Sequence, residues 1–168
     1  MRLSADVSYP ASAAEVARML ADPGFVDARD EATHPVAHSA EVEGSPEGAF
    51  VVRSTRTMPT TDFPQAARRF VGETVEMVQV DSWEAPAADG SRTGTTTMDL
   101  VGAPLTVRTS LRLRADGPDA CTETMEGELK ASVPLIGGSL EKAAAPFVQD
   151  AIRSEEALGR RWLAEHAG

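Results

Sequence analysis

An apolar stripe near the C-terminus constrains the fold more than any other feature of this chain. Across residues 140–166 only Pro146 interrupts a helical pattern, and it can kink the helix. The stripe recurs at spacings of three, four and seven residues, at Leu140, Ala144, Phe147, Ala151, Leu158 and Trp162. About 27 helical residues extend ~40 Å, so such a helix needs a broad surface to cover its stripe. We expect a large sheet to provide that surface.

The residues before this helix alternate with the period of β-strands. We expect strands over residues 2–9, 36–43, 49–58, 73–84, 92–101, 105–114 and 121–133. Ser12 and Glu15 form a capping box that predicts a helix ending near residue 22, and residues 25–32 suggest a second short helix. Ser139 is a candidate cap for the long helix.

This order of elements predicts an α+β fold in one domain spanning residues 1–168. Consecutive strands joined by short turns form an antiparallel sheet, and a sheet of about six to seven strands twists and curves. We expect this sheet to wrap around the C-terminal helix. One helix cannot fill the concave side of a curved sheet, so an apolar cavity should remain between them.

Several short motifs resemble those of a known superfamily. They are Phe63-Pro64, Phe70-Val71-Gly72, Trp83, Gly102-Ala103-Pro104, and the run from Val133-Pro134 to Glu141-Lys142. With them the chain resembles the START-related, birch-allergen-like helix-grip superfamily (SRPBCC), and within it a bacterial family of uncharacterised proteins. The resemblance implies the helix-grip fold. It also implies a cavity for lipids, sterols, hormones or polyketides, and in some members an aromatase or cyclase activity, but it supplies no catalytic residues.

The charge of the chain argues against several partners. The net charge is −10 with no basic tract, and nucleic acids and anionic lipid surfaces bind through basic groups. No stretch approaches the ~18 apolar residues of a membrane span, and the N-terminus lacks the apolar run of a signal peptide. We therefore expect a cytoplasmic protein with no nucleic-acid partner and no integral membrane contact.

The sequence contains no recognisable metal, cofactor or nucleophile motif. His34 and His38 are four residues apart in a strand pattern, which separates them by ~13 Å. The run Gly137-Gly138-Ser139 lacks the Lys and the spacing of a phosphate-binding loop, and a nucleophile elbow is absent. We expect no metal, no cofactor and no catalytic residue of these classes.

The candidate ligand-binding residues are large, soft side chains and one carboxylate. They are Phe50, Met77, Trp83, Met98, Met125, Phe147, Glu155 and Leu158. Glu155 lies on or beside the apolar stripe, where it could act as an acid, a base or a ligand anchor. Arg53 and Arg56 lie on opposite faces of one strand, so one should point inward, toward a ligand carboxylate or toward Glu155.

Three functions are compatible with these residues. The first is binding, transport or sequestration of a hydrophobic or amphipathic small molecule that enters between residues 59–72 and the C-terminal helix. The second is a cavity enzyme of the cyclase, aromatase or hydrolase kind that uses Glu155 or the inward Arg. The third is a protein-interaction module whose core is filled by side chains.

Overall fold

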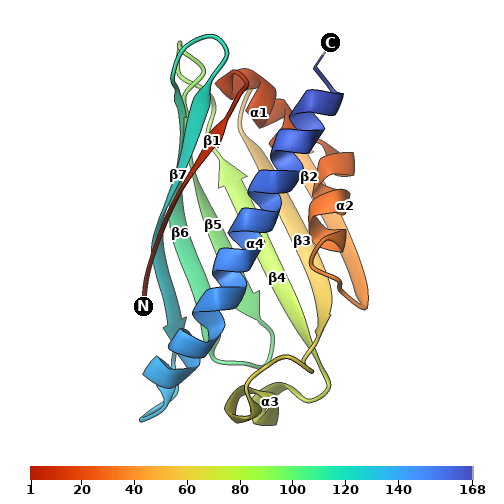
Figure 1. The fold of residues 1–168 in the computed structure, drawn as a ribbon, viewed down its shortest axis with the longest axis vertical. Coiled ribbons are helices and arrows are strands. Elements are labelled where there is room, and N and C mark those ends of the chain that lie inside the picture. The colour runs from red at the N-terminus through yellow and green to blue at the C-terminus, as the bar shows by residue number, and fades with distance from the viewer. Residues whose placement is uncertain (168) are drawn as a thin grey trace.

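The structure, a computed structural model, describes residues 1–167, and for Ala66 the backbone alone. Seven antiparallel strands form one curved sheet in the order β1-β7-β6-β5-β4-β3-β2 (Figure 1). Their bounds are β1 Arg2–Tyr9, β2 Ala37–Gly44, β3 Phe50–Pro59, β4 Thr74–Trp83, β5 Arg92–Leu100, β6 Leu105–Ala115 and β7 Cys121–Ala131. The expected α+β helix-grip fold is thereby confirmed.

Alternation along each strand decides which side chains face the concave side. On β6, Val107, Leu111 and Leu113 are buried, while Arg108 and Arg112 between them are exposed. At one edge of the sheet β1 pairs with β7, and Tyr9 lies opposite Cys121. The first and last strands are therefore neighbours, and both lie beside the C-terminal helix (Figure 1).

Two short helices cover one end of the sheet. Helix α1 (Ala13–Leu20) has the predicted capping box, with Ser12 accepting from the Glu15 N–H and Glu15 accepting from the Ser12 N–H. Helix α2 (Pro23–Glu31) begins after Asp22, whose side chain accepts from the Gly24 N–H. A third helix, α3 (Gln65–Val71), lies at the opposite end of the molecule, in the segment between β3 and β4 (Figure 1).

Helix α4 (Gly137–Glu165) runs diagonally across the concave face and continues past Pro146 (Figure 1). It begins at Gly137, so the expected cap at Ser139 is wrong. The N-cap residue is Ile136, whose carbonyl accepts from the Leu140 N–H. Ser139 already lies inside the first turn, because the chain reverses at Leu135, which has a φ of 69°.

Two buried clusters fix α4 to the sheet at separate places. One joins α1, α2 and one end of the sheet, and Phe25 packs edge-on against Trp162 of α4 with ring centroids 5.6 Å apart. There Gly159 allows close approach, since a Cβ would lie 2.9 Å from the Tyr9 ring. The other cluster contains Leu3, Val107, Leu129 and Ala145. Between the two clusters the helix and the sheet enclose a cavity.

Candidate functional site

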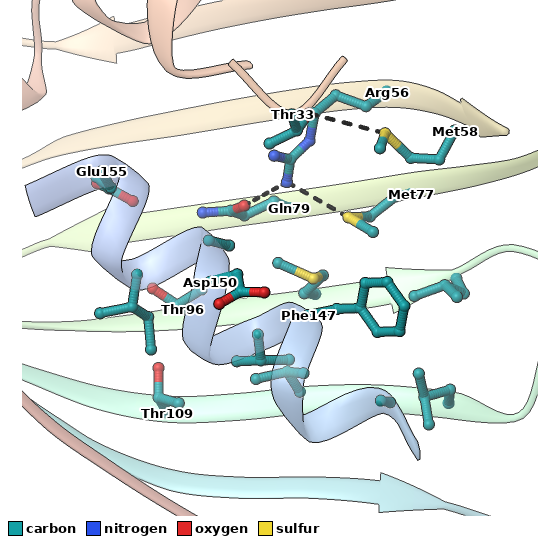
Figure 2. Close-up of a pocket in the computed structure, with 18 of the residues that line it drawn as sticks. Thr33, Arg56, Met58, Met77, Gln79, Thr96, Thr109, Phe147, Asp150 and Glu155 are labelled. Atoms are coloured by element: carbon teal, nitrogen blue, oxygen red, sulfur yellow. Dashed lines mark hydrogen bonds between the residues drawn. The ribbon is translucent and has the colours of Figure 1, made fainter. Parts of the chain in front are cut away.

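The cavity between α4 and the concave face has a volume of about 420 Å³ (Figure 2). Ligand cavities in proteins commonly fall between ~300 and ~1,000 Å³. Small side chains on both walls account for the space. Ala143, Ala144 and Ala151 face it from α4, and Thr96 and Thr109 face it from the sheet.

One end of the cavity, toward α3, is apolar. Its walls come from β3 to β6, from the α3 segment and from the first half of α4, and they include Met58, Phe63, Phe70, Leu100, Leu105 and Phe147. Phe63 and Phe147 face one another with ring centroids 6.0 Å apart. Phe147 is 47% exposed, so this aromatic pair stands at the boundary between cavity and solvent. We call the Phe63–Phe147 pair the mouth of the cavity.

The other end of the cavity carries buried charges and is called the polar end. Its residues are Arg29, Arg56, Gln79, Asp81, Thr96, Glu123 and Glu155. Arg29 Nη1 lies 2.9 Å from Asp81 Oδ2 and 3.8 Å from Glu155 Oε1, and its Nη2 donates to Ser54 Oγ. Asp81 also accepts from Thr96 Oγ1 at 2.7 Å and from Gln79. Arg29 of α2 thus connects α4 to the centre of the sheet.

Arg56 is the arginine of β3 that points inward, whereas Arg53 is exposed on the opposite face. Arg56 Nη2 donates to Gln79 Oε1 at 2.6 Å and contacts the Met77 sulfur (Figure 2). Its Nη1 lies 3.8 Å from Asp30, a fully buried carboxylate on α2. Burial lowers the pKa of Arg56, but an arginine retains its charge in proteins. Glu155 therefore pairs with Arg29, whereas Asp30 lies near both arginines, 3.5 Å from Arg29 Nε and 3.8 Å from Arg56 Nη1.

Two carboxyl groups at the polar end hold protons more tightly than usual. Burial, followed by the charges of Glu155 and Asp81, raises the pKa of Glu123 to about 8. Burial raises the pKa of Glu155 as well, and Arg29 opposes that rise. The Glu155 side chain keeps 30% of its surface accessible and is among the residues that line the cavity. A carboxyl that is reachable and reluctant to ionise can anchor a ligand or transfer a proton.

Seven of the eight side chains predicted from the sequence line this cavity. They are Met77, Trp83, Met98, Met125, Phe147, Glu155 and Leu158. Phe50 does not line it. Phe50 is 1% exposed in the cluster beneath α1 and stacks on Trp83 with centroids 6.4 Å apart. Phe50 begins β3 opposite Trp83 and packs into the core cluster that contains Val16 and Ala17 of α1.

Sequence reasoning missed the polar partners, although strand alternation could have found several of them. Gln79 and Asp81 share the phase of Met77 and Trp83 on β4, so they had to face the same side. Glu123 shares the phase of Met125 on β7. Arg29 follows Phe25 and Val26 on the buried face of α2. Strand alternation therefore indicates the inward polar residues as well as the inward apolar ones.

Residues 1–167 hold no group of three His, Cys, Asp or Glu side chains arranged to bind a metal. His38 instead lies 2.9 Å from Asp27. Burial raises the pKa of Cys121 to about 12, which disfavours a thiolate. Within the same residues, no helix is long and apolar enough to cross a membrane.

Comparisons with known proteins agree with this architecture. A family model described as "Protein of unknown function (DUF2505)" matches residues 4–163. The sequence matches no curated protein.

Solved structures resemble the chain over nearly its whole length. The protein TTHA0849 from Thermus thermophilus has a TM-score of 0.62 at 17% identity, with 99% of each chain covered. The Zhui aromatase/cyclase from Streptomyces sp. R1128 has a TM-score of 0.61 at 12% identity, covering 100% of this chain and 96% of that one. Human STARD10 has a TM-score of 0.60 at 11% identity, covering 99% of this chain and 67% of that one. These structures share the helix-grip fold that the sequence motifs predicted.

Proposed function

This chain belongs to the DUF2505 family, and from the geometry of its cavity we propose that the protein binds a hydrophobic or amphipathic small molecule between the sheet and α4. The observation that carries the proposal is the cavity of about 420 Å³, apolar toward α3 and charged at its far end. An apolar body removed from water there gains roughly 25 cal/mol per Å² of buried area. Among the proteins with a similar fold are human STARD10 and the Zhui aromatase/cyclase.

The ligand would pass the mouth formed by Phe63 and Phe147. The α3 segment contributes Phe63, Pro64 and Phe70 to the wall and packs loosely, with several of its side chains exposed. Loosely held segments open at low free-energy cost, so this segment is suited to admit a ligand. The inner binding surface then comprises Met77, Trp83, Met98, Met125, Glu155 and Leu158. We also propose that residues 1–168 act as one domain, since the sheet and α4 form the cavity together.

Binding is tested with 1-aminoanthracene, an uncharged apolar fluorophore. The chain has two Trp residues, and the Trp162→Phe variant leaves Trp83 alone in the cavity wall. We expect saturable one-to-one binding with energy transfer from Trp83 to the dye. Native mass spectrometry of the purified protein would show any co-purifying ligand. A folded protein that takes up no apolar probe at any concentration contradicts the proposal.

A cavity enzyme of the cyclase or aromatase kind is the second candidate. It is favoured by one observation, the pair of Glu123 and Glu155 at one end of the cavity with raised pKa values. A protonated and an ionised carboxyl together can serve as general acid and base. The test uses a linear diketone probe that can close by intramolecular aldol condensation with loss of one water. Turnover that Glu123→Gln abolishes favours the enzyme, and a probe bound unchanged favours binding alone.

The interaction-module alternative receives less support. It required a core filled by side chains, and the cavity leaves that space open.

A further inference from the structure

We propose that the polar end of the cavity binds a cationic amine head group and discriminates against a carboxylate of the same chain length. This inference rests on the proposed binding function and specifies the ligand class. It follows from the balance of buried charges, from the partners that each arginine already has, and from the acceptors that still face the cavity.

Acidic groups outnumber basic ones around the polar end. Arg29 and Arg56 are the cations, whereas Asp30, Asp81, Glu123 and Glu155 are the acids. Glu123, with a pKa raised to about 8, is mostly protonated at pH 7, so the balance there is two positive against three negative groups. A cationic ligand would reduce this imbalance, and a carboxylate ligand would add a fourth negative charge to it. In a buried site each uncompensated charge carries a large desolvation cost.

Both arginines are already engaged by the protein. Arg29 contacts Asp81 at 2.9 Å, Asp30 at 3.5 Å and Glu155 at 3.8 Å. Arg56 donates to Gln79 and lies 3.8 Å from Asp30. A carboxylate ligand would have to compete with these acids for a guanidinium. Separating a buried pair leaves an uncompensated charge behind, so that exchange is unfavourable.

Two acceptors remain available to a donor on the ligand. Glu155 lies on α4, lines the cavity, is 30% exposed and makes only a long contact of 3.8 Å to Arg29. Thr109 Oγ1 on β6 is buried and has no hydrogen-bond partner among residues 1–167, and it faces the same cavity (Figure 2). An ammonium carries three donors and no acceptor, which suits these oxygens. Burial also raises the pKa of Glu155, and a neighbouring ammonium would lower it again and stabilise the ionised form.

The test compares decylamine, decanol and decanoate as competitors of 1-aminoanthracene at pH 7. All concentrations stay below the critical micelle concentrations of the amine and the acid. The amine and the acid have equal chains and opposite charges, so their ratio isolates the effect of charge. We expect decylamine to displace the dye at a concentration about tenfold lower than decanoate, or lower still. In Glu155→Gln this ratio should fall to about threefold or less. Glu165→Gln, an exposed position on the same helix, should retain the wild-type ratio.

Thr109→Val provides a second variant if Glu155→Gln does not fold. It removes the other available acceptor, so it should reduce the ratio in the same direction. Equal or tighter binding of decanoate by the wild-type protein would overturn the inference while leaving the proposed binding function intact. An amine preference that persists unchanged in Glu155→Gln and Thr109→Val would overturn it too. If the dye itself never binds, the proposed function fails, and this inference fails with it.

Discussion

Arg29 on α2 and Asp81 on β4 form an ion pair 2.9 Å long in the interior, with each side chain 8% exposed. The pair joins the helix that covers one end of the sheet to a central strand, and Glu155 of α4 approaches the same guanidinium. The acids around Arg29 raise its pKa further, although burial alone would lower it. The charged residues of the polar end therefore also hold α2, β4 and α4 together.

Replacement of Arg29 by Met should destabilise the fold by about 3 kcal/mol, because Asp30 and Asp81 would remain buried without their main cation. Urea denaturation at pH 7 measures the change. Arg153→Met is the matched control, since Arg153 pairs with Asp150 on the surface of α4. Similar effects for the two variants would contradict a central role for Arg29.

The stability of the protein should depend on the protonation of Glu123. Its pKa is about 8 in the folded chain and near 4.5 when unperturbed, so between these values the native state holds a proton that the unfolded state has lost. The contribution of this group to stability is therefore full below about pH 4.5 and declines as the pH rises to about 8. Glu123→Gln should flatten that part of the stability profile. Carbon-detected NMR titration should find the Glu123 carboxyl titrating near 8, and an ordinary carboxyl titration there would contradict the described environment.

Widening the mouth should accelerate exchange of a bound probe. The rings of Phe63 and Phe147 face one another, and both are partly exposed, so truncation of either removes a barrier at little cost in stability. Stopped-flow measurements on Phe147→Ala should show faster association and dissociation of 1-aminoanthracene. Val36→Ala, at another exposed apolar residue outside the cavity wall, should leave both rates unchanged. Unchanged rates in Phe147→Ala would place the path of the ligand elsewhere.

Filling the cavity should weaken binding and preserve the fold. Ala151 faces the cavity from the middle of α4, so Ala151→Leu inserts a larger side chain into open space and need not displace its neighbours. We expect an affinity for 1-aminoanthracene reduced about tenfold with the thermal midpoint retained. Ala164→Leu changes an exposed position of the same helix and serves as the control. Equal affinities of the two variants would show that the probe binds outside the cavity.

The fold could be predicted from the sequence because local signals agreed with one another. Residues 2–9 form the expected strand, and the Ser12–Glu15 box begins the expected helix. The alternation along β3 also indicates that Arg56 points inward, because Phe50 and Val52 lie on the same face of the strand and are buried. The start of α4 was missed by three residues, because the reversal at Leu135 depends on backbone geometry and has no side-chain signature.

The pairing within the polar end could not be predicted. Arg29 and Asp81 are 52 residues apart, and only the packing of α2 on the sheet brings them together. The raised pKa of Glu123 likewise arises from burial in the folded chain and then from the charges of Glu155 and Asp81 on other elements. The presence of polar residues on inward faces could be deduced from alternation, but their mutual contacts required the folded chain.

NMR of the methionine methyl groups tests the central claim most directly, because methionine side chains line the cavity. Of the six methionines, Met58, Met77, Met98 and Met125 line the cavity, while Met1 and Met19 lie outside it and serve as internal controls. Titration with decanol should shift the four cavity methyl signals in a saturable way and leave the Met1 and Met19 signals in place. Four unmoved cavity signals, or shifts confined to Met1 and Met19, would contradict a ligand-binding cavity beneath α4.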